Sequence, residues 1–486
     1  MPKKPLPRTT AIVITVVFIV AAAVLAWFGF HLGSNGQTSP LVPTGRAAAA
    51  NAQSDAGGGP NVFPYDVEYP AIGYRTAMPT ARVTQLAQKL ANGTATLSYE
   101  PKRGYLDSLL EALDIDASSQ VLVFSKTSLQ SPYISPKKPR AIYFNDDTYV
   151  AWEQGGPELE IASMDPDLGA VFYSLKQSQV VHPRFPRQTT RCLRCHDTYE
   201  LTGGGVPRFL LGSGYIGTEG QLISHEGWIL TTDITPLESR WGGWYVTGRP
   251  DHAVHLGNLV VQNPADLQHL DTLRVGTLEH LDALLDTSPY VTDKSDIVAL
   301  LVLQHQVYVQ NLIVRANFDA RQALAGAPKP TQGKTAASSA QQTVQKTVDD
   351  VTEPLVRAML FAGAAPITGP LAGTSGFKKR FESLGPRDAR GRSLRELDLD
   401  TRLFRYPLSY LVYSPAFDAL PQPVKARAYE RFAEILSGAD TSRDFAYLST
   451  ADRQAILDIL QATKPEFAAA YRYYAHTAGR GVKAEN

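Results

Sequence analysis

The chain contains only two cysteines, Cys192 and Cys195, and His196 follows the second one directly. This excludes a framework of disulfides, which small exported domains use in place of a large core. The 486 residues must therefore fold around buried apolar side chains, and a composition with 44% hydrophobic and 19% charged residues supplies them. The two thiols have no other cysteine to pair with, so their chemistry is that of one local unit.

The sequence Cys192-Leu193-Arg194-Cys195-His196 has the spacing of a covalent haem-attachment site. Two thiols at this separation add to the two vinyl groups of haem, and the next imidazole reaches the iron from one side. Two alternatives use the same residues. A dithiol redox motif leaves His196 unexplained, and a zinc site requires a further ligand such as a distant histidine.

In these five residues the chain resembles the c-type cytochromes. The resemblance implies one covalently bound haem c, with thioether bonds at Cys192 and Cys195 and with His196 as the proximal iron ligand. It covers a small part of the chain, and it does not extend to the methionine ligand of the small soluble cytochromes c. The only methionine after the motif is Met359, which follows a predicted linker.

The second axial ligand decides whether the iron is closed to substrates. We predict His255 as this distal ligand and His305 as the alternative; the other candidates are His182, His225, His252 and Met164. His255 follows Trp241 and Trp244, whose flat rings can line a haem. Four arginines near the motif are candidates for binding haem propionates, or else form a solvated basic loop: Arg184, Arg187, Arg191 and Arg194.

An uncharged apolar run from Ala11 to Phe30 follows Lys3, Lys4 and Arg8. At about 1.5 Å per residue, such a run crosses a hydrocarbon core of about 30 Å. The preceding positive charges predict a cytoplasmic N-terminus and place the bulk of the chain in the periplasm. The alternative is a signal peptide cleaved near Ala47–Ala50, although the apolar region of such peptides is typically about 7–15 residues.

Composition and periodicity predict five segments. These are a cytoplasmic tip and transmembrane anchor (1–31), a flexible linker (32–62), a haem-bearing domain (63–325), a polar linker (326–345) and a helical C-terminal domain (346–486). The fold class is therefore α+β in the middle of the chain, followed by a mainly α-helical C-terminal part, with an N-terminal transmembrane helix.

Local patterns predict individual elements. Helices are expected over 84–95, 105–115 and 295–318, the last capped by Ser295, and also between Pro423 and Gly438 and after Ser449, where Asp452 completes a cap. Strands are expected at 121–124, 141–144, 149–152, 159–162, 228–231 and 244–247.

Lysine plus arginine and aspartate plus glutamate both total 47, which gives no support to a nucleic-acid partner. The predicted function is that of a single-haem cytochrome, held at the membrane by its N-terminal helix, which exchanges electrons with a redox partner protein. The alternatives are a haem-dependent oxidoreductase or peroxidase acting on a small substrate, and a haem sensor or subunit of a respiratory complex. The sequence does not decide whether the chain is an enzyme.

Overall fold

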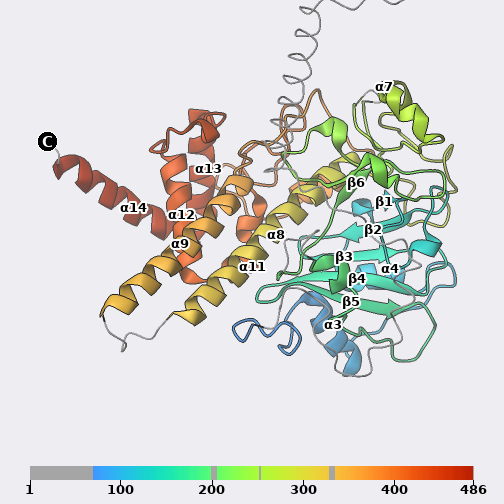
Figure 1. The fold of residues 1–486 in the computed structure, drawn as a ribbon, viewed down its shortest axis with the longest axis horizontal. Helices are drawn as coiled ribbons and strands as arrows, with labels where there is room; N and C mark the ends of the chain where they lie inside the picture. The colour runs from blue at the N-terminus through green and yellow to red at the C-terminus, as the bar shows by residue number, and fades with distance from the viewer. Residues whose placement is uncertain (1–68, 199–204, 251–252, 328–333, 485–486) are drawn as a thin grey trace, which may run out of the picture. The chain divides into compact units, whose positions relative to one another are not determined.

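The computed structural model describes residues 69–198, 205–250, 253–327 and 334–484, and all of them belong to one compact unit. The predicted transmembrane helix and the first predicted linker, in residues 1–62, lie outside the described residues. The centre of the chain is a mixed region built on a sheet, and the C-terminal part is helical, as the sequence predicts (Figure 1).

A five-stranded antiparallel sheet forms the centre, and its strands lie side by side in chain order. The strands are β1 (Val121–Val123), β2 (Arg140–Phe144), β3 (Thr148–Trp152), β4 (Glu158–Asp165) and β5 (Gly169–Lys176). The sequence predicts the first four strands and misses β5. Seven of the eight residues of β5 are buried, so it lacks the alternation that marks a half-exposed strand.

The two faces of this sheet differ in how they are covered. One face carries Val150, Ile161 and Tyr173, which are buried, and it is turned toward helix α3 (Arg82–Ala91), where Thr84 hydrogen-bonds the Tyr173 hydroxyl at 2.7 Å. On the other face, two rows of side chains run across the strands. They are Val121, Ile142, Ala151, Glu160 and Ser174, and Phe144, Tyr149, Ala162 and Phe172.

Helix α8 (Ile297–Gly326) runs between the sheet and the C-terminal helices and contacts both (Figure 1). It is long and apolar enough to cross a membrane, but 83% of its most apolar window is buried, as in the core helix of a folded protein. The helix is capped by Asp296, which accepts bonds from the backbone N–H of Val298 at 2.8 Å and of Ala299 at 3.2 Å. The predicted cap Ser295 is wrong, because its hydroxyl instead donates to the Tyr245 carbonyl at 2.6 Å.

The C-terminal part contains α9 (Lys334–Met359), α12 (Gln422–Leu436), α13 (Thr450–Thr463) and α14 (Pro465–Ala484). The capping box of Ser449 and Asp452 is confirmed at the start of α13. Gly438, with φ +83°, follows the end of α12 as predicted. Helix α9 packs against both α8 and α12.

The second predicted linker and the predicted division into domains differ from the structure. Residues 334–345 form the first half of α9, whose polar composition hides a narrow apolar stripe at Val344, Val348 and Val351. One hydrophobic core includes residues from Ile72 to Phe467, so segments 63–325 and 346–486 share it.

The remaining described elements are short. They are the helices α4 (Leu106–Ala112), α5 (Leu193–His196), α7 (Leu270–Leu273), α10 (Phe377–Ser383) and α11 (Pro415–Asp418), the strands β6 (Gly212–Gly214) and β7 (Trp228–Leu230), and several 3₁₀ helices. The predicted strand over 244–247 is wrong: this segment makes only isolated bridges, from Trp244 to Val123 and from Thr247 to Leu278 and Asp296.

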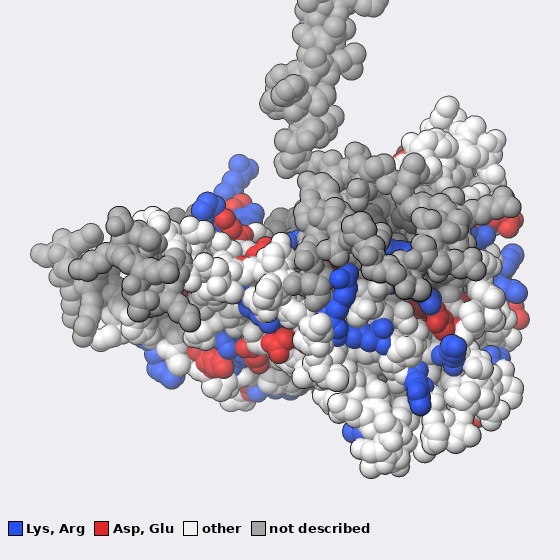
Figure 2. Space-filling view, turned by 60° about the horizontal axis from the view of Figure 1, so that its bottom comes forward, with Lys and Arg blue, Asp and Glu red and all other residues white. Residues whose placement is uncertain are grey.

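Charged side chains are distributed over the surface in small groups. On the face drawn in Figure 2, blue and red side chains are mixed over the C-terminal helices, and uncharged residues separate the blue groups over the sheet-bearing part. Among the described residues on that face, the picture shows no continuous field of one sign.

Candidate functional site

The two cysteines and His196 lie on a single helical turn. Cys192 precedes α5, and its carbonyl accepts bonds from the backbone N–H of Cys195 at 3.2 Å and of His196 at 3.1 Å. Residues three and four apart share one side of a helix, so the two thiols and the imidazole are presented together. Both thiols are free and partly exposed.

His196 is held in one tautomer. Its Nδ1 lies 2.6 Å from the Arg208 carbonyl oxygen, which can only accept, so Nδ1 donates and Nε2 keeps its lone pair. The Arg208 backbone N–H donates in return to the His196 carbonyl at 2.9 Å. Burial lowers the pKa of His196 and favours the neutral ring. A neutral imidazole with a hydrogen-bonded Nδ1–H and an available Nε2 is the state in which histidine binds a metal.

The turn lies against the less covered face of the sheet. The ring of Phe172 on β5 is 4.5 Å from the His196 ring, centre to centre. Ile142 and Ala162 lie on the same face, and although β2 and β4 are interior strands, both side chains are partly exposed. Apolar side chains of the sheet therefore lie on the face where His196 contacts Phe172, and side chains of this kind can pack against a porphyrin ring.

The electrostatic environment weakens the dithiol alternative. Burial raises the pKa of Cys192 to about 12, with a further contribution from the charge of Glu160, and burial also raises the pKa of Cys195. Redox-active dithiols require a lowered thiol pKa, because the thiolate is the nucleophile. These thiols are instead protonated at neutral pH.

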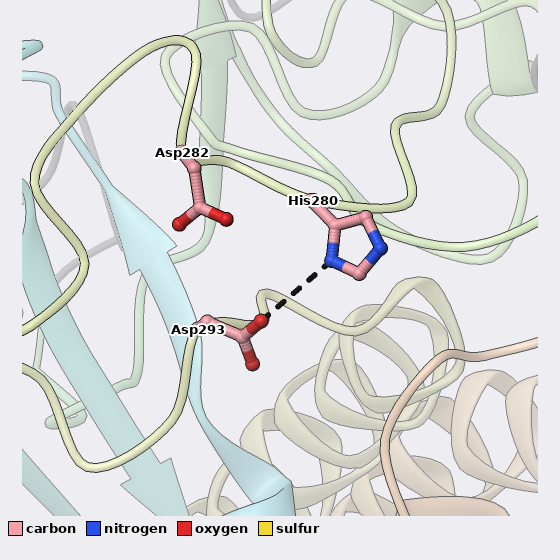
Figure 3. Close-up of side chains that lie close together, drawn as sticks. All are labelled: His280, Asp282 and Asp293. Carbon is pink, nitrogen blue, oxygen red and sulfur yellow. Dashed lines mark ion pairs between the residues drawn. The ribbon is translucent and has the colours of Figure 1, made fainter.

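A zinc site at the cysteines also lacks support. Within the described residues, one set of three metal-binding side chains lies within 4.8 Å, namely His280, Asp282 and Asp293, and it includes neither cysteine (Figure 3). The Lys294 ammonium lies 2.8 Å from His280 Nδ1 and 3.0 Å from Asp293 Oδ2, so this set already binds a cation. We therefore assign no metal to it.

The two predicted distal ligands form hydrogen bonds with residues outside the motif, His255 through Nε2 and His305 through both ring nitrogens. His255 Nε2 lies 3.0 Å from the Thr277 hydroxyl, and burial lowers the pKa of His255 to about 4. His305 uses both nitrogens: Nδ1 lies 2.7 Å from Asp233 and Nε2 lies 2.8 Å from the Ser409 hydroxyl. His305 thus has no nitrogen left for iron in this arrangement, and neither ring forms a hydrogen bond or ring contact with the motif.

The other predicted residues are dispersed. Arg187 bonds the Ala77 carbonyl at 2.9 Å and also the Tyr74 carbonyl, and Arg191 pairs with Glu158, so both have partners other than a propionate. His182 and His225 are exposed, Met164 is buried on β4 and His252 lies outside the described residues.

Sequence reasoning named the arginines near the thiols but missed Phe172, the Arg208 carbonyl and the two glutamates Glu158 and Glu160. The first depends on strand register and the second on a backbone atom, and neither leaves a signal in the sequence. Comparison with protein-family models, with curated proteins and with solved structures finds no match for the chain. The geometry of residues 192–196 and their surroundings is therefore the basis for assigning a function.

Proposed function

We propose that the chain is a membrane-anchored c-type cytochrome, with one covalent haem, that transfers electrons at the outer face of the cytoplasmic membrane. The observation that supports this most directly is the single turn that presents two free thiols beside a neutral imidazole with an available Nε2. A haem bound there supplies one-electron chemistry at its iron.

The residues of the chain then have separate roles. Cys192 and Cys195 hold the porphyrin by thioether bonds, and His196 is the proximal ligand. The Arg208 carbonyl orients the imidazole and raises its basicity as a ligand. Phe172 fixes the ring from one side and keeps water away from it.

The location follows from the sequence and is part of the same proposal. The apolar run Ala11–Phe30 anchors the chain as a single span, and the preceding positive charges place the bulk of the protein in the periplasm. Helix α8 is not this anchor, because it is buried in the core. The electron donor and acceptor are redox partner proteins on that side of the membrane.

The test is the mass of the chain after expression with a haem c maturation system. We expect the added mass of one haem and a haem-stained band on a denaturing gel. Cys192→Ala with Cys195→Ala should abolish both signals, whereas Arg194→Lys, which changes the motif between the cysteines, should keep them. A wild-type chain without the added porphyrin mass contradicts the proposal. A bound zinc ion found instead of haem supports the alternative of a zinc site at the cysteines.

A second candidate is a haem enzyme or sensor that acts on a small molecule. It is favoured by the hydrogen bonds that engage His255 Nε2 and both nitrogens of His305. An iron without a strong sixth ligand binds exogenous molecules. A low-spin spectrum that carbon monoxide and cyanide leave unchanged supports the electron carrier, and a high-spin or ligand-responsive spectrum supports the enzyme or sensor.

A further inference from the structure

Two glutamates share their partners on the sheet face that carries the motif. Glu153 directly follows β3 and its side chain is 0% exposed; Glu160 lies on β4 and is 23% exposed. Arg140 lies between them, 3.5 Å from each carboxylate. The Ser128 hydroxyl lies 2.9 Å from Glu160 and 3.4 Å from Glu153. Gln130 donates to the second oxygen of Glu153 at 2.8 Å.

The local charges do not balance when every group is ionised. Glu158 on β4 is paired with Arg191, which lies just before the motif. In the ion pairs of the described residues, Arg140 on β2 serves both Glu153 and Glu160. A buried carboxylate without its own counter-charge is unfavourable, so the form of the pair that binds one proton is the more stable one. Burial and the charge of Glu160 accordingly raise the pKa of Glu153 to about 8.

The pair is electrically connected to the motif through Glu160. After burial, the negative charge of Glu160 is the next cause of the raised pKa of Cys192 and of Cys195, and it partly offsets the lowering of the His196 pKa by burial, so all three side chains are close enough to sense it. The positive charge of Arg194, on the same turn, lowers the pKa of Cys195 and so opposes the effect of Glu160. Because electrostatic coupling is reciprocal, a change of charge at the motif alters the proton affinity of the two glutamates.

We propose that Glu153 and Glu160 form a proton-binding pair that takes up one proton when one electron enters the Cys192–His196 site. The inference rests on the proposed function. The electron comes from a one-electron donor and reduces the iron, and the proton comes from solvent. Glu160 is the more exposed member of the pair, and the Ser128 hydroxyl lies within hydrogen-bond distance of both carboxylates. One carboxyl O–H bond forms on reduction and breaks on reoxidation, when electron and proton both leave.

The test is the midpoint potential of the full-length, haem-bearing protein in detergent, titrated with dithionite and ferricyanide between pH 6 and pH 9. Uptake of one proton per electron makes the potential fall as pH rises, with a slope that approaches about 59 mV per pH unit. Glu153→Gln keeps an acceptor for Gln130 but cannot bind the proton, so its slope should fall by at least half. Glu111→Gln, at an exposed position on α4, should keep the wild-type slope.

A second measurement does not depend on haem. At pH 7 the haem-free wild-type chain, in which no ferric charge lowers the proton affinity of the pair, should show the infrared carbonyl band of a protonated carboxylic acid, and haem-free Glu153→Gln should lack it. Glu160→Gln provides a second variant if the first fails to fold, and it should flatten the same slope. If the wild type lacks this band, Glu153 and Glu160 do not share a bound proton, and the proposal is wrong. If the haem-bearing wild type has a potential that does not change with pH, the link between reduction and proton binding is wrong, and the proton-binding pair itself is not affected. A chain without haem overturns the proposed function and the coupling together.

Discussion

Glu153 shows how one side chain near the motif links pH to stability. The group is buried, and its carboxylate shares a single guanidinium with Glu160, so its protonated form is the more stable one inside the fold. Its pKa in the folded chain is about 8, above the ordinary value of 4.5. The stabilisation from this group is therefore fully present below about pH 4.5 and is lost as the pH rises through 8.

We predict that Glu153→Gln removes this pH dependence. Relative to the variant, the wild type should lose free energy of unfolding between pH 5 and pH 9, and one pKa unit corresponds to about 1.4 kcal/mol. Urea unfolding across this range measures the difference, with Glu111→Gln as the exposed control. A difference between wild type and Glu153→Gln that stays constant from pH 5 to pH 9 would contradict the assignment of a protonated Glu153.

At the scale of elements, a buried polar relay joins three segments distant in sequence. His305 on α8 bonds Asp233, which follows β7, at 2.7 Å and Ser409, which caps the 3₁₀ helix Tyr410–Tyr413, at 2.8 Å. Although serine, histidine and aspartate lie in the order of a hydrolase triad, His305 and Ser409 are 0% exposed. Phe361 stacks on the imidazole with ring centres 4.4 Å apart. The relay therefore holds α8 in place and has no access to a substrate.

Replacing His305 with alanine tests this structural role. Loss of the imidazole leaves the Asp233 carboxylate and the Ser409 hydroxyl buried without this partner, which should destabilise the fold by about 3 kcal/mol. Chemical denaturation measures the loss, and His182→Ala, at an exposed position, is the matched control. The haem content and spectrum of the folded variant should equal those of the wild type. A shift to high spin would instead make His305 an iron ligand.

The elements that the sequence predicts correctly are those whose signals are local. The cap of Ser449 and Asp452 and the glycine after α12 act within one turn of their helices. Strand β5 and helix α9 are missed because burial on both faces and a polar composition remove the usual periodicity. The same division holds for the candidate site. The motif is readable from spacing, whereas the neighbours of the thiols and imidazole, such as Phe172 and Glu160, depend on strand register.

For the molecule as a whole, the shared core argues against independent domains. Helix α8 contacts both β5 and α9, and the buried cluster continues from the sheet into the C-terminal helices. Val298, Ile313 and Phe318 of α8 are all nearly inaccessible to solvent. A chain ending at residue 327 would lose α9 and the helices after it, and apolar side chains of α8 would become exposed.

We therefore predict that a chain truncated after residue 327 does not fold, even though it retains the whole predicted haem-bearing domain. The full chain should unfold in one cooperative transition, because no boundary in its core separates two units. Circular dichroism and tryptophan fluorescence should give coincident thermal transitions for the full chain, whereas the truncated chain should aggregate or lack a transition. The contrary result would be two separated transitions in the full chain and a truncated chain that is soluble, folded and able to bind haem. It would show that the haem-bearing part folds independently and that it meets the C-terminal helices only at a docking interface.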